Sequence, residues 1–197
     1  MIAGHFGLAA AVKSRVPRAP LWALMLATVW LDVLFVPLLV LGVETFVPAA
    51  IAAGSRPGYG EGIIYADYTH SLLGALVLSA AFGALIGWRW GRTAGIATGA
   101  VAFSHWLLDL PMHRHDMPLF PGNLGDLPRL GFGLWQWPTA AALLELALVL
   151  AGTFLYWRAA VRIAEGHGAE LVRRAHVTAG TMLASGIVTL ALSVAGL

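Results

Sequence analysis

Five apolar runs long enough to cross a lipid bilayer constrain this chain more than any other feature. They extend roughly over residues 20–43, 63–88, 93–110, 138–157 and 175–197, and a helix needs about 20 mostly apolar residues to cross the hydrocarbon layer. A shorter apolar stretch over 2–12 lacks the basic leading region and the small-residue cleavage site of a signal peptide, so we expect a retained helix. The prediction is therefore all-α: one domain over 1–197, a polytopic membrane helical bundle of five full transmembrane helices plus a short N-terminal helix.

Composition supports this class and excludes several functions. The chain is 59% hydrophobic and 11% charged, with a mean hydropathy of +0.78, which leaves too little polar surface for a soluble domain. The net charge is only +2 and the basic residues lie between the apolar runs, so no nucleic-acid partner is predicted. Cysteine is absent, and any metal must therefore be held by His, Asp or Glu.

The basic residues predict an orientation. Nine of the twelve fall on one side of the predicted spans: Lys13, Arg15, Arg18, Arg89, Arg92, Arg158, Arg162, Arg173 and Arg174. The positive-inside rule places that side in the cytoplasm and the loops 44–62 and 111–137 outside. The loop 111–137 is long, rich in Pro and Gly, and aromatic, so we expect it to lie at the membrane interface over a functional site.

His105 and Asp109 are the strongest indication of such a site. They stand four residues apart in Ser104-His105-Trp106-Leu107-Leu108-Asp109, and residues at that spacing share one helix face. Ionisable side chains are costly within a membrane and usually functional. At about 1.5 Å per residue, several polar side chains reach nearly one level, roughly 15–21 Å above the basic residues of their own segments: His5, Asp32, His105 and Glu145.

A cluster of histidines and carboxylates without thiols suits zinc, with manganese or iron as poorer fits. We predict a shared metal site formed by Asp32, His70, His105 and Asp109. Further candidate ligands are His5, Glu145 and His113 or its neighbour His115.

Each candidate also has a simpler interpretation. His70 could be an interfacial hydrogen bonder, and Asp32 could pair with an arginine or belong to a proton path. Glu145 could be a polar contact between helices, and His113 could belong to a solvated loop.

Four short segments resemble those of a known family. Gly4-His5, Leu31-Asp32, Thr69-His70-Ser71-Leu72-Leu73 and the His105 segment are similar to the pattern of the membrane-bound metal-dependent hydrolases, the YdjM-like inner-membrane hydrolases. The resemblance covers roughly the first 120 residues. It implies an integral protein of the bacterial inner membrane with hydrolase activity.

That family is in turn distantly similar to the zinc-dependent phospholipase C and single-strand nuclease superfamily. The order of its ligands is followed here up to His113 or His115, but Ala141 stands where a histidine should precede Glu145 by four residues, and the N-terminal Trp is missing. The resemblance therefore implies one or two ions, one at Asp32, His70, His105 and Asp109 and a second near His5.

The same resemblance implies a mechanism and a substrate. A divalent ion would activate water and polarise the scissile oxygen, with Asp32 as the base. Arg114, with Arg56 or Arg129 reaching from the outer loops, would neutralise a phosphate. The substrate would be a phosphoester of a membrane lipid or a lipid-linked molecule, approached from the non-cytoplasmic side.

Two other functions remain open from the residues alone. Intramembrane Asp, Glu and His also line the pathways of metal or proton transporters, although polar residues do not continue from the cluster toward the cytoplasm. A ceramidase-like zinc amidase would use a serine beside the metal ligands, and Ser104 adjoins His105.

Overall fold

The computed structural model describes residues 2–47 and 62–195, and within them the all-α prediction is confirmed. The described residues are 73% helical and contain seven α-helices. These are α1 (Ile2–Arg15), α2 (Leu21–Thr28), α3 (Trp30–Val40), α4 (Leu72–Trp90), α5 (Arg92–Met112), α6 (Pro138–Ala164) and α7 (Ala169–Val194). Two short antiparallel strands, β1 (Thr45–Val47) and β2 (Ile63–Tyr65), pair with Phe46 opposite Ile64.

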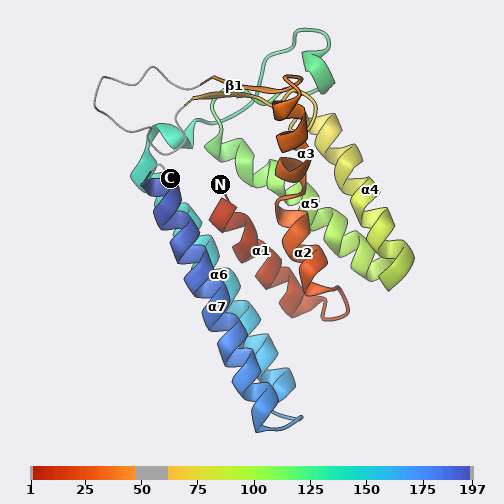
Figure 1. Ribbon diagram of the computed structural model, residues 1–197, viewed down its shortest axis with the longest axis vertical. Coiled ribbons are helices and arrows are strands. Elements are labelled where there is room, and N and C mark those ends of the chain that lie inside the picture. The colour runs from red at the N-terminus through yellow and green to blue at the C-terminus, as the bar shows by residue number, and fades with distance from the viewer. Residues whose placement is uncertain (1, 48–61, 196–197) are drawn as a thin grey trace.

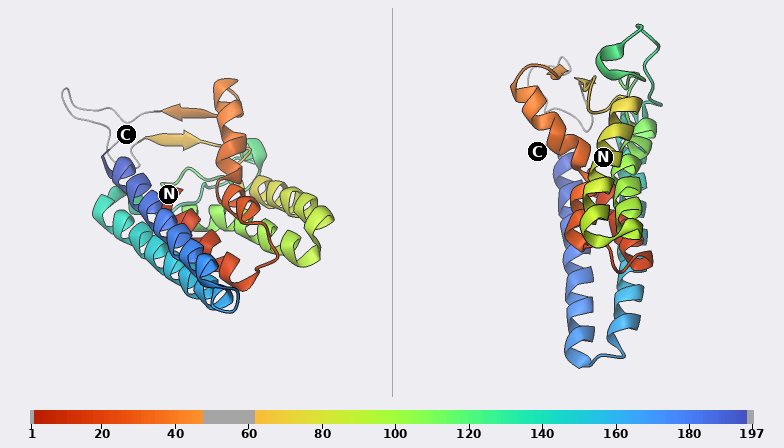
Figure 2. Two further views of the ribbon diagram at one scale, coloured as in Figure 1. Left: turned by 60° about the horizontal axis from the view of Figure 1, so that its bottom comes forward. Right: turned by 90° about the vertical axis from the view of Figure 1, so that its right-hand side faces the viewer.

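The helices form two antiparallel pairs joined by α1 (Figure 1). The long hairpin of α6 and α7 lies on one side, and the α4–α5 pair lies on the other. Between them, α1 packs against α6 and also contacts α2, α5 and α7. The β-hairpin crosses the end of the bundle at which α3 ends and α4 begins (Figures 1 and 2).

Glycines allow α4 and α5 to approach closely. A Cβ atom on Gly83 would lie 2.8 Å from the carbonyl oxygen of Gly95 and 2.9 Å from the Cα of Gly99. A Cβ on Gly7 would likewise overlap the backbone of α6 at Leu148. Small residues at helix contacts are typical of membrane bundles, where close backbone packing stabilises association.

The structure does not support five full spans. Within the described residues three helices, α4, α6 and α7, are long and apolar enough to cross a membrane, and a fourth span is found if α2 and α3 are counted together. That pair is bent by 50°. At the bend, Val29 has φ −118° and ψ 14°, which interrupts the helix in the middle of the apolar run 20–43.

Two other expected spans also differ from the structure: the run 93–110 is not among the candidate spans, whereas the run 63–88 contains one, α4, that starts later than predicted. The run 93–110 is helical, as α5, but its polar residues Thr98, His105 and Asp109 are buried within the protein, so α5 need not be as apolar as a lipid-facing helix. The run 63–88 begins with β2 and a turn, and α4 starts only at Leu72. There the Ser71 hydroxyl accepts a hydrogen bond from the amide of Gly74 at 3.1 Å and caps the helix.

The loop 111–137 is held against the start of α4. The amide of Leu72 donates to the carbonyl of Pro118 at 3.0 Å, and the amide of Gly122 donates to the carbonyl of Asp67 at 2.9 Å. Arg129 forms a two-pronged ion pair with the Asp67 carboxylate, at 2.6 and 2.9 Å. This hydrogen-bonded partner raises the pKa of Arg129.

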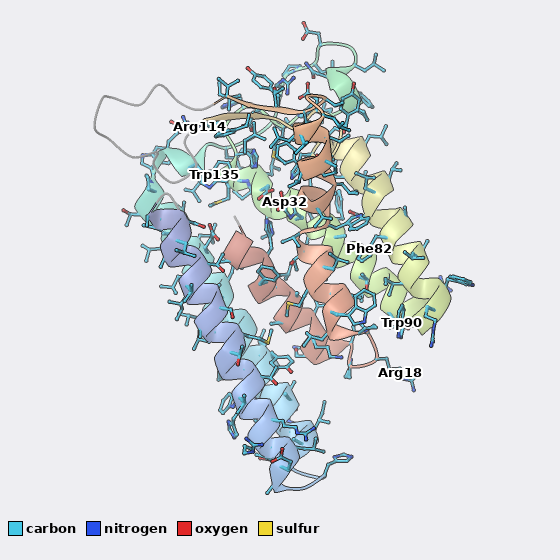
Figure 3. The ribbon with its side chains drawn as sticks, in the orientation of Figure 1. Arg18, Asp32, Phe82, Trp90, Arg114 and Trp135 are labelled. Carbon is cyan, nitrogen blue, oxygen red and sulfur yellow. The ribbon has the colours of Figure 1, made fainter. Side chains whose placement is uncertain are left out.

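The two ends of the bundle differ in their residues. Figure 3 shows Arg18 and Trp90 at one end, and Arg114 and Trp135 toward the other. Residues 48–61, which form most of the loop 44–62, and residues 196–197, at the end of the run 175–197, lie outside the described part of the chain.

Candidate metal centre

Five of the predicted ligands converge. They come from three helices and one turn: His5 on α1, Asp32 on α3, His70 just before α4, and His105 with Asp109 on α5. Two groups within this cluster have the spacing needed to hold an ion, and His105 belongs to both. Figure 3 places Asp32 at the inner end of α3, where α3 meets α5.

The first group is a triangle of three ligand atoms. The Nε2 atoms of His70 and His105 are 3.2 Å apart, and Oδ1 of Asp32 lies 3.5 Å from the first and 3.6 Å from the second. In a tetrahedral zinc site with bonds of about 2.0–2.1 Å, neighbouring ligand atoms are about 3.3 Å apart. The triangle therefore matches one face of such a tetrahedron. Oδ2 of Asp109, 3.0 Å from Nε2 of His105, lies next to it.

The hydrogen bond of His105 fixes which ring nitrogen faces this triangle. Its Nδ1 lies 2.6 Å from the carbonyl oxygen of Thr28, the last residue of α2. A carbonyl can only accept, so Nδ1 must carry the proton and donate it. In the neutral ring, Nε2 is then left with its lone pair toward Asp32 and His70.

The orientation of His70 is fixed in the same way through a neighbouring hydroxyl. Its Nδ1 lies 2.9 Å from Oγ1 of Thr69, and that hydroxyl lies 2.9 and 3.1 Å from the two carboxylate oxygens of Glu44. A carboxylate only accepts, so the hydroxyl donates to Glu44 and accepts the Nδ1 proton of His70. The backbone of His70 is also held, because Trp106 Nε1 donates to its carbonyl at 2.8 Å.

His113 has a third arrangement of this kind at the edge of the cluster. Its Nδ1 donates to Oδ1 of Asp116 at 2.9 Å, while its Nε2 lies 3.8 Å from Oδ2 of Asp109. His113 is 5% exposed, so it is a buried residue and not part of a solvated loop. His115 is exposed, and of the two histidines only His113 has contacts with the cluster.

The second group, His5 with His105 and Asp109, fits a single ion less well. The two imidazoles are stacked, with centroids 4.1 Å apart and planes inclined by 15°. A ring nitrogen's lone pair lies in the plane of its ring, so one ion cannot lie close to both planes. His5 instead orients Asp109, with Nε2 3.2 Å from Oδ1. Its Nδ1 is buried without a hydrogen-bond partner among the described residues.

Access to the cluster is uneven. The side chains of His70 and His105 are 6% and 1% exposed, whereas that of Asp32 is 39% exposed. Asp32 therefore forms the open edge of the triangle, and a substrate or water would approach there.

The structure does not bring the remaining predicted residues into the cluster. Glu145 is buried, but one of its oxygens accepts from the backbone amide of Gly4 at 3.2 Å, and it belongs to neither metal-capable group in the described residues. Arg114 is half-buried, and its Nε has no hydrogen-bond partner among the described residues. Arg129 is occupied by Asp67, and Arg56 lies outside the described residues.

Sequence reasoning missed the groups that orient the imidazoles. Glu44, Thr69 and Asp116 are each less than 5% exposed. The carbonyl of Thr28 carries no sequence signal at all. Glu44 directly follows Val43, the last residue of the first apolar run, so in the sequence it resembles an ordinary interfacial acid.

Comparison of the chain with protein-family models, with curated proteins and with solved structures finds no match. The case for a function therefore rests on the geometry of these residues.

Proposed function

We propose that the chain is a membrane-embedded hydrolase that uses a divalent metal, with zinc as the best fit, to cleave a phosphoester of a membrane lipid or a lipid-linked molecule. The observation that carries the proposal is the triangle of Asp32, His70 and His105. Its edges of 3.2–3.6 Å match zinc ligation. When both rings are neutral and protonated on Nδ1, two lone pairs face each other at 3.2 Å, and a cation between them would relieve that repulsion.

The anchored Nδ1 atoms add to this argument. Histidines that bind a metal commonly donate their other N–H to a carbonyl or carboxylate, which fixes the tautomer. His105 donates to a carbonyl, His113 to a carboxylate, and His70 to a hydroxyl that is itself bonded to a carboxylate. Three neighbouring imidazoles anchored in this way through Nδ1 are typical of a metal site.

Asp32 and Asp109 have different roles in this proposal. Asp109 is buried and held by His5 and His105, so it completes the ligand set and balances charge. Asp32 is the exposed member, and its second oxygen can accept a proton from an attacking water. A divalent ion in the triangle would acidify that water and polarise the ester oxygen.

The surroundings favour a substrate borne by the membrane. The cluster belongs to helices of a bundle with three to four candidate spans, and its open edge lies on α3, whose side chains Val33, Val36 and Val40 are exposed. An ester presented at the lipid surface would reach Asp32 along this apolar face. The choice of a phosphoester follows from the family resemblance.

Neither alternative function gains equal support. The Ser104 hydroxyl donates to the carbonyl of Val101 at 2.6 Å, within its own helix, so it is not aimed at the cluster as a zinc amidase would need. For a transporter, Thr98 is a buried hydroxyl two turns from His105 on the same face of α5, but the buried residues beyond it on that helix, Gly95 and Ala94, are apolar. Ser79 on α4 adds a second buried hydroxyl, and two hydroxyls do not make an ion pathway.

The test is turnover by protein reconstituted in liposomes that contain mixed phospholipids, prenyl phosphates and ceramides. We expect release of phosphate or headgroup that chelation abolishes and zinc restores. Asp32→Asn should lose this activity, whereas the matched variant Asp126→Asn, at an exposed loop position, should retain it. Equal turnover by both variants, or a metal flux without hydrolysis, would overturn the proposal.

A further inference from the structure

We propose that Glu44 is a positioning residue of the metal centre, which acts through Thr69 to hold the Nε2 lone pair of His70 toward the ion. The inference rests on the proposed metal centre and adds a residue that the sequence motifs do not contain.

Glu44 is a buried acid held by hydrogen bonds. It is 1% exposed, lies between α3 and β1, and among the described residues no basic side chain pairs with it. Oε1 accepts from the backbone amides of Tyr68 and Thr69, both at 2.8 Å. The Thr69 hydroxyl adds contacts with both carboxylate oxygens. A buried carboxylate is tolerated only when such donors replace its lost hydration.

Both amides donate to Oε1, so the Thr69 hydroxyl is the donor for Oε2. That hydroxyl has only one proton and gives it to Glu44. Its oxygen therefore has a lone pair available for His70, at 2.9 Å from Nδ1. Because the Thr69 hydroxyl donates to Glu44, its oxygen can only accept from His70, and the proton of the imidazole is therefore held on Nδ1.

The alternative tautomer shows why this matters. If the proton of His70 were on Nε2, it would point at Nε2 of His105, 3.2 Å away, and at Oδ1 of Asp32. The proton would then form a hydrogen bond there and occupy the position of the ion. Glu44 and Thr69 together favour the tautomer that leaves this position open.

Variants at Thr69 separate positioning from packing. Thr69→Val keeps the shape and removes the hydroxyl, and Thr69→Ser keeps the hydroxyl. Glu44→Gln provides a second test, because an amide can donate to the hydroxyl and reverse its direction. Thr181→Val is the control, since the Thr181 hydroxyl bonds only within its own exposed helix turn.

The measurements are zinc affinity by chelator competition and the His70 tautomer by nitrogen NMR of the metal-free protein, with thermal unfolding as a check of folding. We expect Thr69→Val to weaken zinc binding by about 10- to 100-fold, in the range for groups that orient a ligand, and to move the His70 proton partly to Nε2. Thr69→Ser and Thr181→Val should bind zinc like the unchanged protein.

The outcomes distinguish this inference from the proposed function. If the unchanged protein binds no metal, the metal centre fails, but loss of the Nδ1–H tautomer in folded Thr69→Val would still support the role of Glu44 and Thr69. Folded Thr69→Val with unaltered tautomer and zinc affinity would overturn the positioning role even if the protein binds zinc.

Discussion

Nδ1 of His105 lies 2.6 Å from the carbonyl oxygen of Thr28, immediately before the residue at which the first apolar segment bends. In an unbroken helix, that carbonyl would accept from the amide four residues later. The bend instead turns a backbone acceptor toward the imidazole that both metal-capable groups share. The same bend brings Asp32 to the cluster, so the interruption of the span and the formation of the site are one feature.

The first prediction concerns metal content. Protein purified without chelators should carry about one zinc per chain, and His105→Ala should lose it because His105 contributes to both metal-capable groups. His167→Ala, at an exposed histidine between α6 and α7, is the control. Elemental mass spectrometry is the measurement, and full zinc retention by His105→Ala would contradict the assignment.

The second prediction concerns stability gained from the ion. A ligand that binds only the folded state stabilises it by about 2.7 kcal/mol when its concentration is 100 times the dissociation constant. Zinc should therefore raise the unfolding temperature of the unchanged protein in detergent, and it should not raise that of a double variant, His70→Ala with His105→Ala. An equal rise in both would mean that zinc binds elsewhere.

The third prediction concerns the contact of α4 with α5. Gly83→Ala should destabilise the protein by about 1–3 kcal/mol, the usual effect of overpacking, because its new methyl group would meet the backbone of Gly95. Gly180→Ala in α7 meets nothing within 4 Å and should stabilise by about 0.5–1 kcal/mol. Unfolding in mixed detergent micelles measures both, and similar effects of the two changes would refute the close approach.

The fourth prediction concerns the ion pair between Arg129 and Asp67, which holds the loop 111–137. Arg129→Gln removes the two-pronged pair with Asp67, both partners being about one-fifth exposed, and should destabilise the loop by about 1 kcal/mol. Hydrogen exchange should become faster at the amides of Leu72 and Gly122, which bond across this junction. Arg174→Gln, which breaks a largely exposed pair with Glu170, should leave these amides unchanged. Unchanged protection in Arg129→Gln would show that other contacts hold the loop.

The fifth prediction concerns sidedness. The chain has no cysteine, so single cysteines can report it. Leu124→Cys, at a 74% exposed position, should react with an impermeant thiol reagent applied to intact cells. Gly166→Cys, between α6 and α7, should react only after lysis, because the basic residues flanking it favour the cytoplasm. The reverse pattern would invert the orientation.

The residues that converge in the cluster could be predicted from the sequence because their signals are local. Residues His105 and Asp109 share a helix face by spacing alone, and matched depths placed His5 and Asp32 at the same level. Glu145 shows the limit of that argument, because its depth is matched as well, yet it bonds the backbone of Gly4 instead of joining the cluster. The number of residues from a helix end predicts how high a side chain lies along the bundle, but it does not predict which neighbouring helix that side chain faces.

The spans and the orienting groups could not be predicted, since both depend on tertiary contacts. No glycine or proline marks the bend at Val29, and mostly apolar residues continue on both sides of it. The polar residues of α5 lower its mean hydropathy below that of a candidate span. These residues are buried against neighbouring helices and do not face lipid. Glu44 finds its partners 24 and 25 residues further along the chain, beyond any local pattern.

The bend at Val29 also leaves α3 attached to the bundle through its first turn. There Leu31 packs with Ala75 and Trp106, and the Trp30 indole donates to the carbonyl of Leu78. Beyond that turn Val36 and Val40 are exposed, and Figure 2 shows this helix leaning away from the bundle. An ion bound by Asp32, His70 and His105 would cross-link the same turn to α4 and α5, so its removal would loosen α3 before it loosened the other helices.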